Sequence, residues 1–109
     1  MTAISPEQPV VTLINVFTVE PENQDHLVGL LVEATDRVMR HVPGFVSANI
    51  HRGLDGRHVA NYAQWESPDA YQRMLGDPEA RRHMEPILEL ATNEGHLYEV
   101  VHVEGRPPS

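Results

Sequence analysis

The chain has 109 residues and a formal net charge of −8 at pH 7, because sixteen acidic residues outnumber eight basic ones. This length suits one domain, and the negative surface disfavours nucleic acid or an anionic membrane as the main partner. The absence of cysteine excludes disulfides and thiolate nucleophiles, and the absence of lysine excludes a Schiff base with a cofactor.

The first half of the chain predicts a strand and a helix. Residues 10–19 (VVTLINVFTV) are continuously apolar and rich in β-branched side chains, which is typical of a strand buried on both faces. Pro21 and Glu22 open the helix, because proline is tolerated in a first turn and an acid suits the positive end of the helix dipole. The helix ends before Pro43-Gly44 and carries one apolar stripe, formed by Leu27, Leu30, Leu31, Ala34 and Val38.

The second half predicts a hairpin, a divided helix and a last strand. Residues 45–52 and 57–65 have strand composition and are separated by a Gly/Asp-rich turn. Ser67-Pro68 and Asp77-Pro78 each place an N-cap before proline, so we expect two short helices, the second broken or kinked at Pro86. Residues 97–103 (LYEVVHV) predict the final strand.

This β-α-β-β-α-β order predicts an α+β, ferredoxin-like split βαβ fold with a four-stranded antiparallel sheet and both helices on one face. We expect a single domain at 10–104 with flexible termini at 1–9 and 105–109. The second sheet face is expected to be too apolar for water, so that a homodimer covers it. Its expected residues are Val46, Ala48, Ile50 and Tyr62.

The length of the hairpin loop decides which side chains share a face. A three-residue loop, 54–56, suits a type I turn closed by a left-handed Gly56, and it pairs His51 with Val59. A loop of two or four residues would instead turn His51 to the opposite face. With three residues, one face collects amides, an imidazole and an indole, a mixture that favours a ligand cavity over a dry core. The expected members are Phe45, Ser47, Asn49, His51, Asn61, Ala63 and Trp65.

Several of these residues also have purely structural interpretations. A tryptophan at a strand end, such as Trp65, is often a core residue. Asn15 and Asn61 suit structural hydrogen bonds within a sheet. Tyr71 has helical spacing to other apolar residues and is by default a core residue. The seven histidines form no HxH or HExxH pattern, so no metal site is predicted.

The segment at 61–67 (NYAQWES), preceded by PGFVSANIH at 43–51, resembles the antibiotic biosynthesis monooxygenase family, and within it the cofactor-independent type of the actinorhodin pathway. The resemblance extends over about residues 10–103. It implies a dimeric α/β barrel with one cavity per subunit, between sheet and helices. It also implies oxidation of a polycyclic phenol or quinol-type aromatic, polyketide-like, by O₂ to a quinone without flavin, haem or metal.

The resemblance assigns catalytic roles to His51, Asn61, Trp65 and Tyr71. His51 is the candidate base, Trp65 and Tyr71 stack on the substrate, and Asn61 donates to a phenolate or peroxide oxygen. The family's helix arginine has no exact match, and Arg81 or Arg82 is expected to replace it. The expected substrate-binding residues are Asn15, Phe45, Asn49, Met74 and Arg82.

Two other functions stay open. One is an aromatic-binding or cyclase-like helper protein without oxygen chemistry. The other is a haem-degrading monooxygenase, which would use Asn15 and His83 but has Met74 near that branch's tryptophan position. We expect no membrane span and no signal peptide, and hence a cytoplasmic protein.

Overall fold

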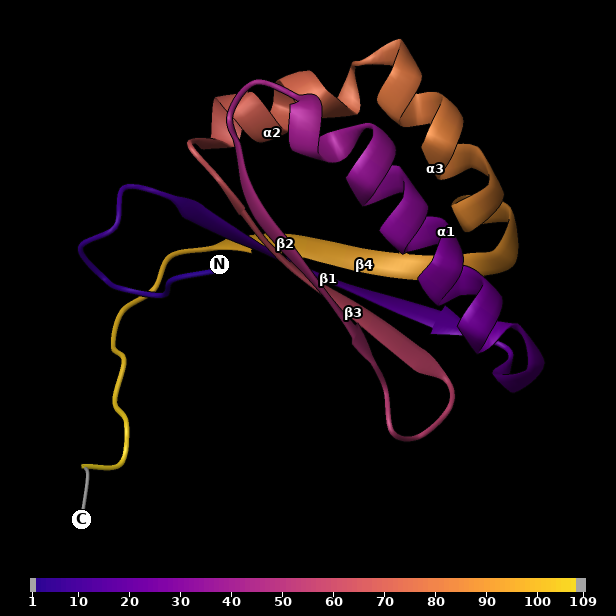
Figure 1. Ribbon diagram of the computed structural model, residues 1–109, viewed down its shortest axis with the longest axis horizontal. Helices are drawn as coiled ribbons and strands as arrows, with labels where there is room; N and C mark the ends of the chain where they lie inside the picture. Colours follow the sequence, from indigo (N-terminus) through magenta and orange to yellow (C-terminus); the bar gives the residue numbers. More distant parts are fainter. Residues whose placement is uncertain (1, 108–109) are drawn as a thin grey trace.

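The structure, a computed structural model, describes residues 2–107 (Figure 1). The predicted order of strands and helices is confirmed, with two short 3₁₀ helices (η) added. In chain order the elements are β1 (Val11–Val19), η1 (Pro21–Asn23), α1 (Gln24–Arg37), η2 (Met39–His41), β2 (Phe45–Arg52), β3 (His58–Trp65), α2 (Pro68–Leu75), α3 (Pro78–Leu90) and β4 (Ala91–Tyr98). The second helix of the ferredoxin-like pattern is therefore in two pieces, as expected.

The sheet has the strand order β2-β3-β1-β4, and all neighbours are antiparallel. The three α-helices lie over one face of this sheet, with β1 in its centre (Figure 1). The core fills the space between sheet and helices, where Phe17, Leu27, Val59 and Ile87 are fully buried. The opposite face carries no helix within residues 2–107.

Side-chain caps begin the two later helices, as the sequence predicts. The Ser67 hydroxyl accepts a hydrogen bond from the Ala70 N–H at 3.1 Å. The Asp77 carboxylate accepts one hydrogen bond from the Ala80 N–H at 3.3 Å and another from the Glu79 N–H at 2.8 Å. These caps replace the missing intrahelical acceptors of the first turn, so they fix where α2 and α3 start.

Of the break or kink predicted at Pro86, the break is wrong, because α3 continues through the proline to Leu90. Proline removes one N–H bond, to the carbonyl four residues earlier, which normally disfavours a helix interior. Packing compensates here: Ala80 and Ile87, on the inner side of α3, are almost completely buried. The helix is thus held by its apolar face on both sides of the proline.

The predicted last strand, 97–103, is placed too late. β4 pairs with β1 along its full length, from Ala91 opposite Val19 to Tyr98 opposite Thr12. Because β1 begins at Val11, residues 99–107 have no strand beside them within the described part of the chain, and they extend away from the sheet (Figure 1). The weakly strand-forming sequence TNEG, at 92–95, is nevertheless a strand because its neighbour in the sheet requires one.

The hairpin loop has four residues, 54–57, and not three. The Gly53 N–H donates to the His58 carbonyl at 2.7 Å, so these two residues close the loop. The Asp55 carboxylate inside the turn accepts hydrogen bonds from the N–H groups of Arg57 (2.8 Å) and His58 (3.1 Å). Gly56 has a φ of +78°, which confirms its predicted left-handed conformation. The four-residue loop is favoured because the Asp55 carboxylate accepts hydrogen bonds from the N–H groups at the end of the loop.

This loop shifts the hairpin register by one residue, so the predicted pairing of His51 with Val59 is wrong. His51 lies opposite Ala60, and its exposed side chain is on the face without helices. Ala48 and Ile50, expected on that outer face, turn toward the helices instead. An irregularity at Val46 lets Phe45 pair with Trp65 as predicted. The outer face is therefore less apolar than expected.

The N-terminal segment contacts the end of that outer face. Gln64 Nε2 donates to the Ala3 carbonyl at 2.7 Å, and the Thr2 hydroxyl donates to Asn49 Oδ1 at 2.7 Å. The expected flexible termini include Met1 and residues 108–109, which lie outside the described residues. Within residues 2–107, no helix combines the length and the apolar character needed to cross a bilayer.

Candidate active site

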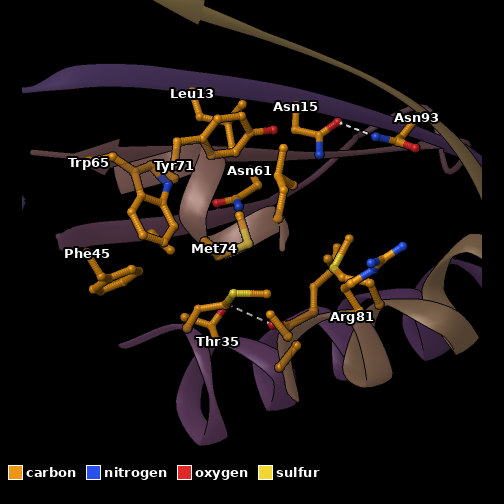
Figure 2. A pocket seen from close by; sticks show the side chains of 18 of the residues that line it. Leu13, Asn15, Thr35, Phe45, Asn61, Trp65, Tyr71, Met74, Arg81 and Asn93 are labelled. Carbon is orange, nitrogen blue, oxygen red and sulfur yellow. Dashed lines mark hydrogen bonds between the residues drawn. The ribbon is translucent and has the colours of Figure 1, made fainter. Parts of the chain in front are cut away.

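A cavity of about 440 Å³ lies between the sheet and the helices (Figure 2). Its walls contain many small side chains, and these leave space that larger residues would fill. Alanines come from α1, β2, β3 and α3: Ala34, Ala48, Ala63 and Ala80. The volume falls within the range of about 300–1,000 Å³ that is usual for small-molecule sites.

Three aromatic side chains form one end of the cavity (Figure 2). The ring centroids of Phe45 and Trp65 are 5.6 Å apart at 89°, and those of Trp65 and Tyr71 are 6.1 Å apart at 61°. Both are edge-to-face contacts, which fix the indole between its neighbours. Trp65 is only 2% exposed, so it belongs to the core and lines the cavity at once.

A polar row crosses the sheet at the other end. Asn15 on β1 lies opposite Asn61 on β3 and opposite Gly95 on β4. Asn93, two residues before Gly95, donates from Nδ2 to Asn15 Oδ1 at 3.1 Å (Figure 2). Arg81 reaches the cavity from α3 and forms no ion pair within residues 2–107. The site therefore joins an aromatic wall to a group of amides and one guanidinium.

Two residues that line this cavity each have a buried polar atom without a hydrogen-bond partner within residues 2–107: Asn61 Oδ1 and Trp65 Nε1. Leaving such an atom unpaired costs about 1–3 kcal/mol. Buried polar atoms are nearly always paired in proteins, so two orphans in one cavity need an explanation. Both atoms are closed off from the open part of the cavity, so a ligand that donates to Asn61 and accepts from Trp65 would satisfy both once the side chains around them shift.

Tyr71 lines the cavity from α2, and its surroundings change the acidity of its phenol. Burial raises the pKa of its phenol above the ordinary value, because the charged form is poorly solvated there. The phenol therefore stays protonated at neutral pH. Tyr71 can donate a hydrogen bond to a ligand, but it is not poised to accept a proton.

The structure brings together six of the nine residues that the sequence predicts for the site. These are Asn15, Phe45, Asn61, Trp65, Tyr71 and Met74, all of which line the cavity. Most of them come from strand positions of the same parity or from the inner side of α2. The hairpin slip does not affect them, because β3 keeps its alternation and the irregularity at Val46 restores Phe45.

Three predicted site residues lie elsewhere. The exposed His51 places Nδ1 3.0 Å from the Asn49 carbonyl oxygen, on the outer face of the sheet. Asn49 shares that face, where its Nδ2 donates to the Tyr62 carbonyl at 2.9 Å. Both misplacements follow from the one-residue register shift. Arg82 points away from the cavity and pairs with Glu79 at 3.2 Å, so Arg81 is the arginine that lines the site.

Sequence reasoning missed Asn93 at the polar end, together with Thr35, Met39 and Glu85 on the helical side. Asn93 was missed because the last strand was placed too late. A strand beginning at Ala91 would have put Asn93 and Gly95 on the same face by simple alternation.

No histidine lines the cavity among the described residues, and no three metal-ligating side chains gather within residues 2–107. His83, which a haem-degrading site would need, lies outside the cavity lining and contacts the Glu79 carbonyl at 3.2 Å. The position of His83 therefore does not favour the haem alternative.

Comparisons with known proteins agree with this geometry. Residues 10–86 match the family model for antibiotic biosynthesis monooxygenase. Tetracenomycin-F1 monooxygenase of Streptomyces glaucescens is 41% identical over 105 residues, which are 96% of this chain and 94% of that protein.

Two solved structures are also similar. The monooxygenase from the gene ActVA-Orf6 of Streptomyces coelicolor, in complex with nanaomycin D, has a TM-score of 0.79 and 30% identity, covering 94% of this chain and 96% of that one. SnoaB, a cofactor-independent oxygenase from Streptomyces nogalater, has a TM-score of 0.71 and 27% identity, covering 88% and 97%. From its sequence, its ferredoxin-like fold and these relatives, the chain belongs to the antibiotic biosynthesis monooxygenase family.

Proposed function

We propose that this protein is a cofactor-independent monooxygenase that oxidises a polycyclic phenol or quinol-type aromatic of polyketide kind to a quinone with O₂. The observation that carries the proposal is the pair of unpartnered buried atoms, Asn61 Oδ1 and Trp65 Nε1, in a cavity with an aromatic wall. A phenolic polyketide offers hydroxyl donors, carbonyl acceptors and a flat ring for stacking. The names of the relatives, one a tetracenomycin F1 monooxygenase and one bound to nanaomycin D, support the same substrate class.

The substrate itself supplies the electrons in this reaction. A deprotonated phenol is electron-rich enough to reduce O₂, and the ring carbon para to the oxygen receives one oxygen atom. The other oxygen atom leaves as water, so one phenol and one O₂ give one quinone and one water. The enzyme then has to bind the ring, stabilise the negative oxygen and exclude competing reactions. SnoaB, described as cofactor-independent, supports chemistry of this kind without a resident cofactor.

Within the described residues the cavity offers hydrogen-bond donors for an anion but no histidine base. Trp65 Nε1 at the aromatic end and the Arg81 guanidinium at the polar end are donors for ligand oxygens at the two ends of the cavity, and Tyr71 remains a neutral donor. Such donors and a cation lower the pKa of a bound phenol. We therefore propose that the phenol proton leaves to water, and that His51 takes no part in its removal.

Oxygen uptake with a panel of anthrones, naphthols and quinols tests the proposal. We expect consumption of one O₂ per substrate, incorporation of one atom from ¹⁸O₂ into the product, and no product under nitrogen. Tight binding of the same compounds without oxygen uptake would refute the oxygenase and support the helper alternative. Added haem with a shifted Soret band and haem breakdown would support the haem alternative instead.

We also propose a homodimer across the sheet face that carries no helix. This face presents Ile14, Val16 and Tyr62, of which Val16 is 38% exposed in the single chain. Apolar strand residues of this kind are usually covered. A sedimentation coefficient of a monomer at micromolar concentration would contradict the dimer.

A further inference from the structure

Asn93 is absent from the predicted site and makes one side-chain contact that bears on it. Its Nδ2 donates to Asn15 Oδ1 at 3.1 Å, at the polar end of the cavity (Figure 2). From this contact we infer that Asn93 is a positioning residue, which holds the Asn15 carboxamide with Nδ2 turned toward the ligand. The inference rests on the proposed function, because it assigns Asn15 a donor role toward the substrate oxygen.

The Asn15 side chain is enclosed on the sheet side. It is 8% exposed, and Gly95 lies directly opposite it on β4. A Cβ atom at Gly95 would lie 3.1 Å from Asn15 Cγ and 3.2 Å from Oδ1, closer than ordinary contact. The glycine thus lets the amide lie against β4, and the neighbouring Asn93 meets the oxygen end of that amide.

A carboxamide fits such a slot in two orientations, which differ only in exchanging oxygen and nitrogen. Shape does not choose between them, so the hydrogen-bond partner decides. In the structure the Asn93 N–H group donates, which goes with the orientation that places Asn15 Oδ1 toward β4, and Figure 2 shows the Asn15 nitrogen turned toward the cavity. The cavity therefore receives a donor at this point.

The orientation matters because the proposed reaction develops negative charge. A fixed N–H group beside a phenolate or peroxide oxygen stabilises it, whereas an amide oxygen in the same place would repel it. Asn61, directly opposite Asn15, keeps an unpartnered acceptor in the same cavity. Correct orientation of Asn15 thus gives the site a donor and an acceptor on adjacent strands.

Asn93→Asp reverses the direction of the hydrogen bond to Asn15 without changing the shape of residue 93. Its carboxylate only accepts, so Asn15 must turn Nδ2 toward it and present oxygen to the substrate. We expect kcat to fall by roughly tenfold to a hundredfold near neutral pH, the loss of a hydrogen bond to a charged group, with little change in KM. Below the pKa of the introduced carboxyl, its O–H group donates to Asn15 again and kcat returns toward the wild-type value.

The decisive quantity is the ratio of variant to wild-type kcat at each pH. The other charged groups that line the cavity, Arg81 and Glu85 on α3, are present in both proteins, so their effect on kcat is common to both and cancels in the ratio. Asn93→Ala should lower kcat by a ratio that does not recover in acid. Glu94→Gln, on the outer face of the same strand, is the matched control and should leave kcat unchanged at every pH. If the ratio of Asn93→Asp kcat to wild-type kcat does not change with pH, the inference is overturned.

A readout independent of turnover separates this inference from the proposed function. In ¹H–¹⁵N spectra, the side-chain NH₂ signals of Asn15 should titrate with the introduced carboxyl in Asn93→Asp and show no such titration in Glu94→Gln. If the wild type turns over no phenol and this titration appears, the proposed function fails and the positioning role stands. If the Asn15 NH₂ signals do not change as the introduced carboxyl titrates, the positioning role fails, whatever the activity.

Discussion

Replacing Asn61 by leucine separates a ligand-binding amide from a structural one. Asn61 Oδ1 is buried without a partner, which costs the ligand-free protein about 1–3 kcal/mol. Leucine has nearly the same shape and removes that unpaired oxygen, so Asn61→Leu should be at least as stable as the wild type. A gain of about 1 kcal/mol would raise Tm by about 4 °C or more in a domain of this size.

The same substitution should reduce catalysis. It removes the acceptor that meets the substrate hydroxyl, and we expect kcat/KM to fall by about tenfold to a hundredfold. Thermal melts without ligand and oxygen uptake with the phenol panel measure the two effects. Asn49→Leu is the matched control, because this amide is bonded to Thr2 and to the Tyr62 carbonyl on the outer face. It should lose stability and keep its kcat/KM.

A lower Tm together with unchanged kcat/KM in Asn61→Leu would refute this reasoning. That outcome would mean that Asn61 has a protein partner in solution and that its oxygen is not reserved for a ligand. The opposite behaviour of the two asparagines is the informative result, since they lie on adjacent strands and differ in the face they occupy.

Two further predictions concern His51 and Tyr71. His51→Ala should leave kcat/KM unchanged from acid to neutral pH, because His51 is exposed on the outer face; a loss that is largest below the substrate's own pKa would restore it as the base. Burial raises the pKa of Tyr71, so an absorbance titration should contain a phase above the ordinary tyrosine range, and Tyr71→Phe should remove that phase. The stability linked to this raised pKa is present below about pH 10 and is lost as pH rises through the folded-state pKa, so Tm above pH 10 should fall more steeply in the wild type than in Tyr71→Phe.

Much of the fold was predictable because its signals are local. Ser67 and Asp77 precede proline at helix starts, and both act as caps in the structure. The continuous apolar run at 10–19 indicated a strand, and β1 does lie there, although Val16 and Thr18 on its outer face are exposed and not buried as expected. The site residues on β3 were predictable for the same reason, since alternation along one strand places Asn61 and Trp65 on one face.

The errors arose where a long-range contact decides the outcome. β4 is a strand because β1 offers it a row of hydrogen bonds, although its sequence at 92–95 has low strand propensity. Residues 100–103 (VVHV), whose composition is more typical of a strand, have no neighbouring strand within residues 2–107. Missing β4 also meant missing Asn93, whose position follows only from the true start of the strand.

The register of the hairpin depends on one carboxylate, and the proposed mechanism depends on that register. Asp55 accepts from the Arg57 and His58 N–H groups, and the Arg57 contact is the largest cause of its lowered pKa. These bonds close a loop of four residues, which turns His51 outward and Ala48 inward. A small alanine thus lies where a three-residue loop would have directed a polar β2 side chain. The turn that places Ala48 in the cavity also keeps His51, the candidate base, out of it. For this reason we expect the pKa of the bound substrate, lowered by the donors around it, to set the pH dependence of the reaction.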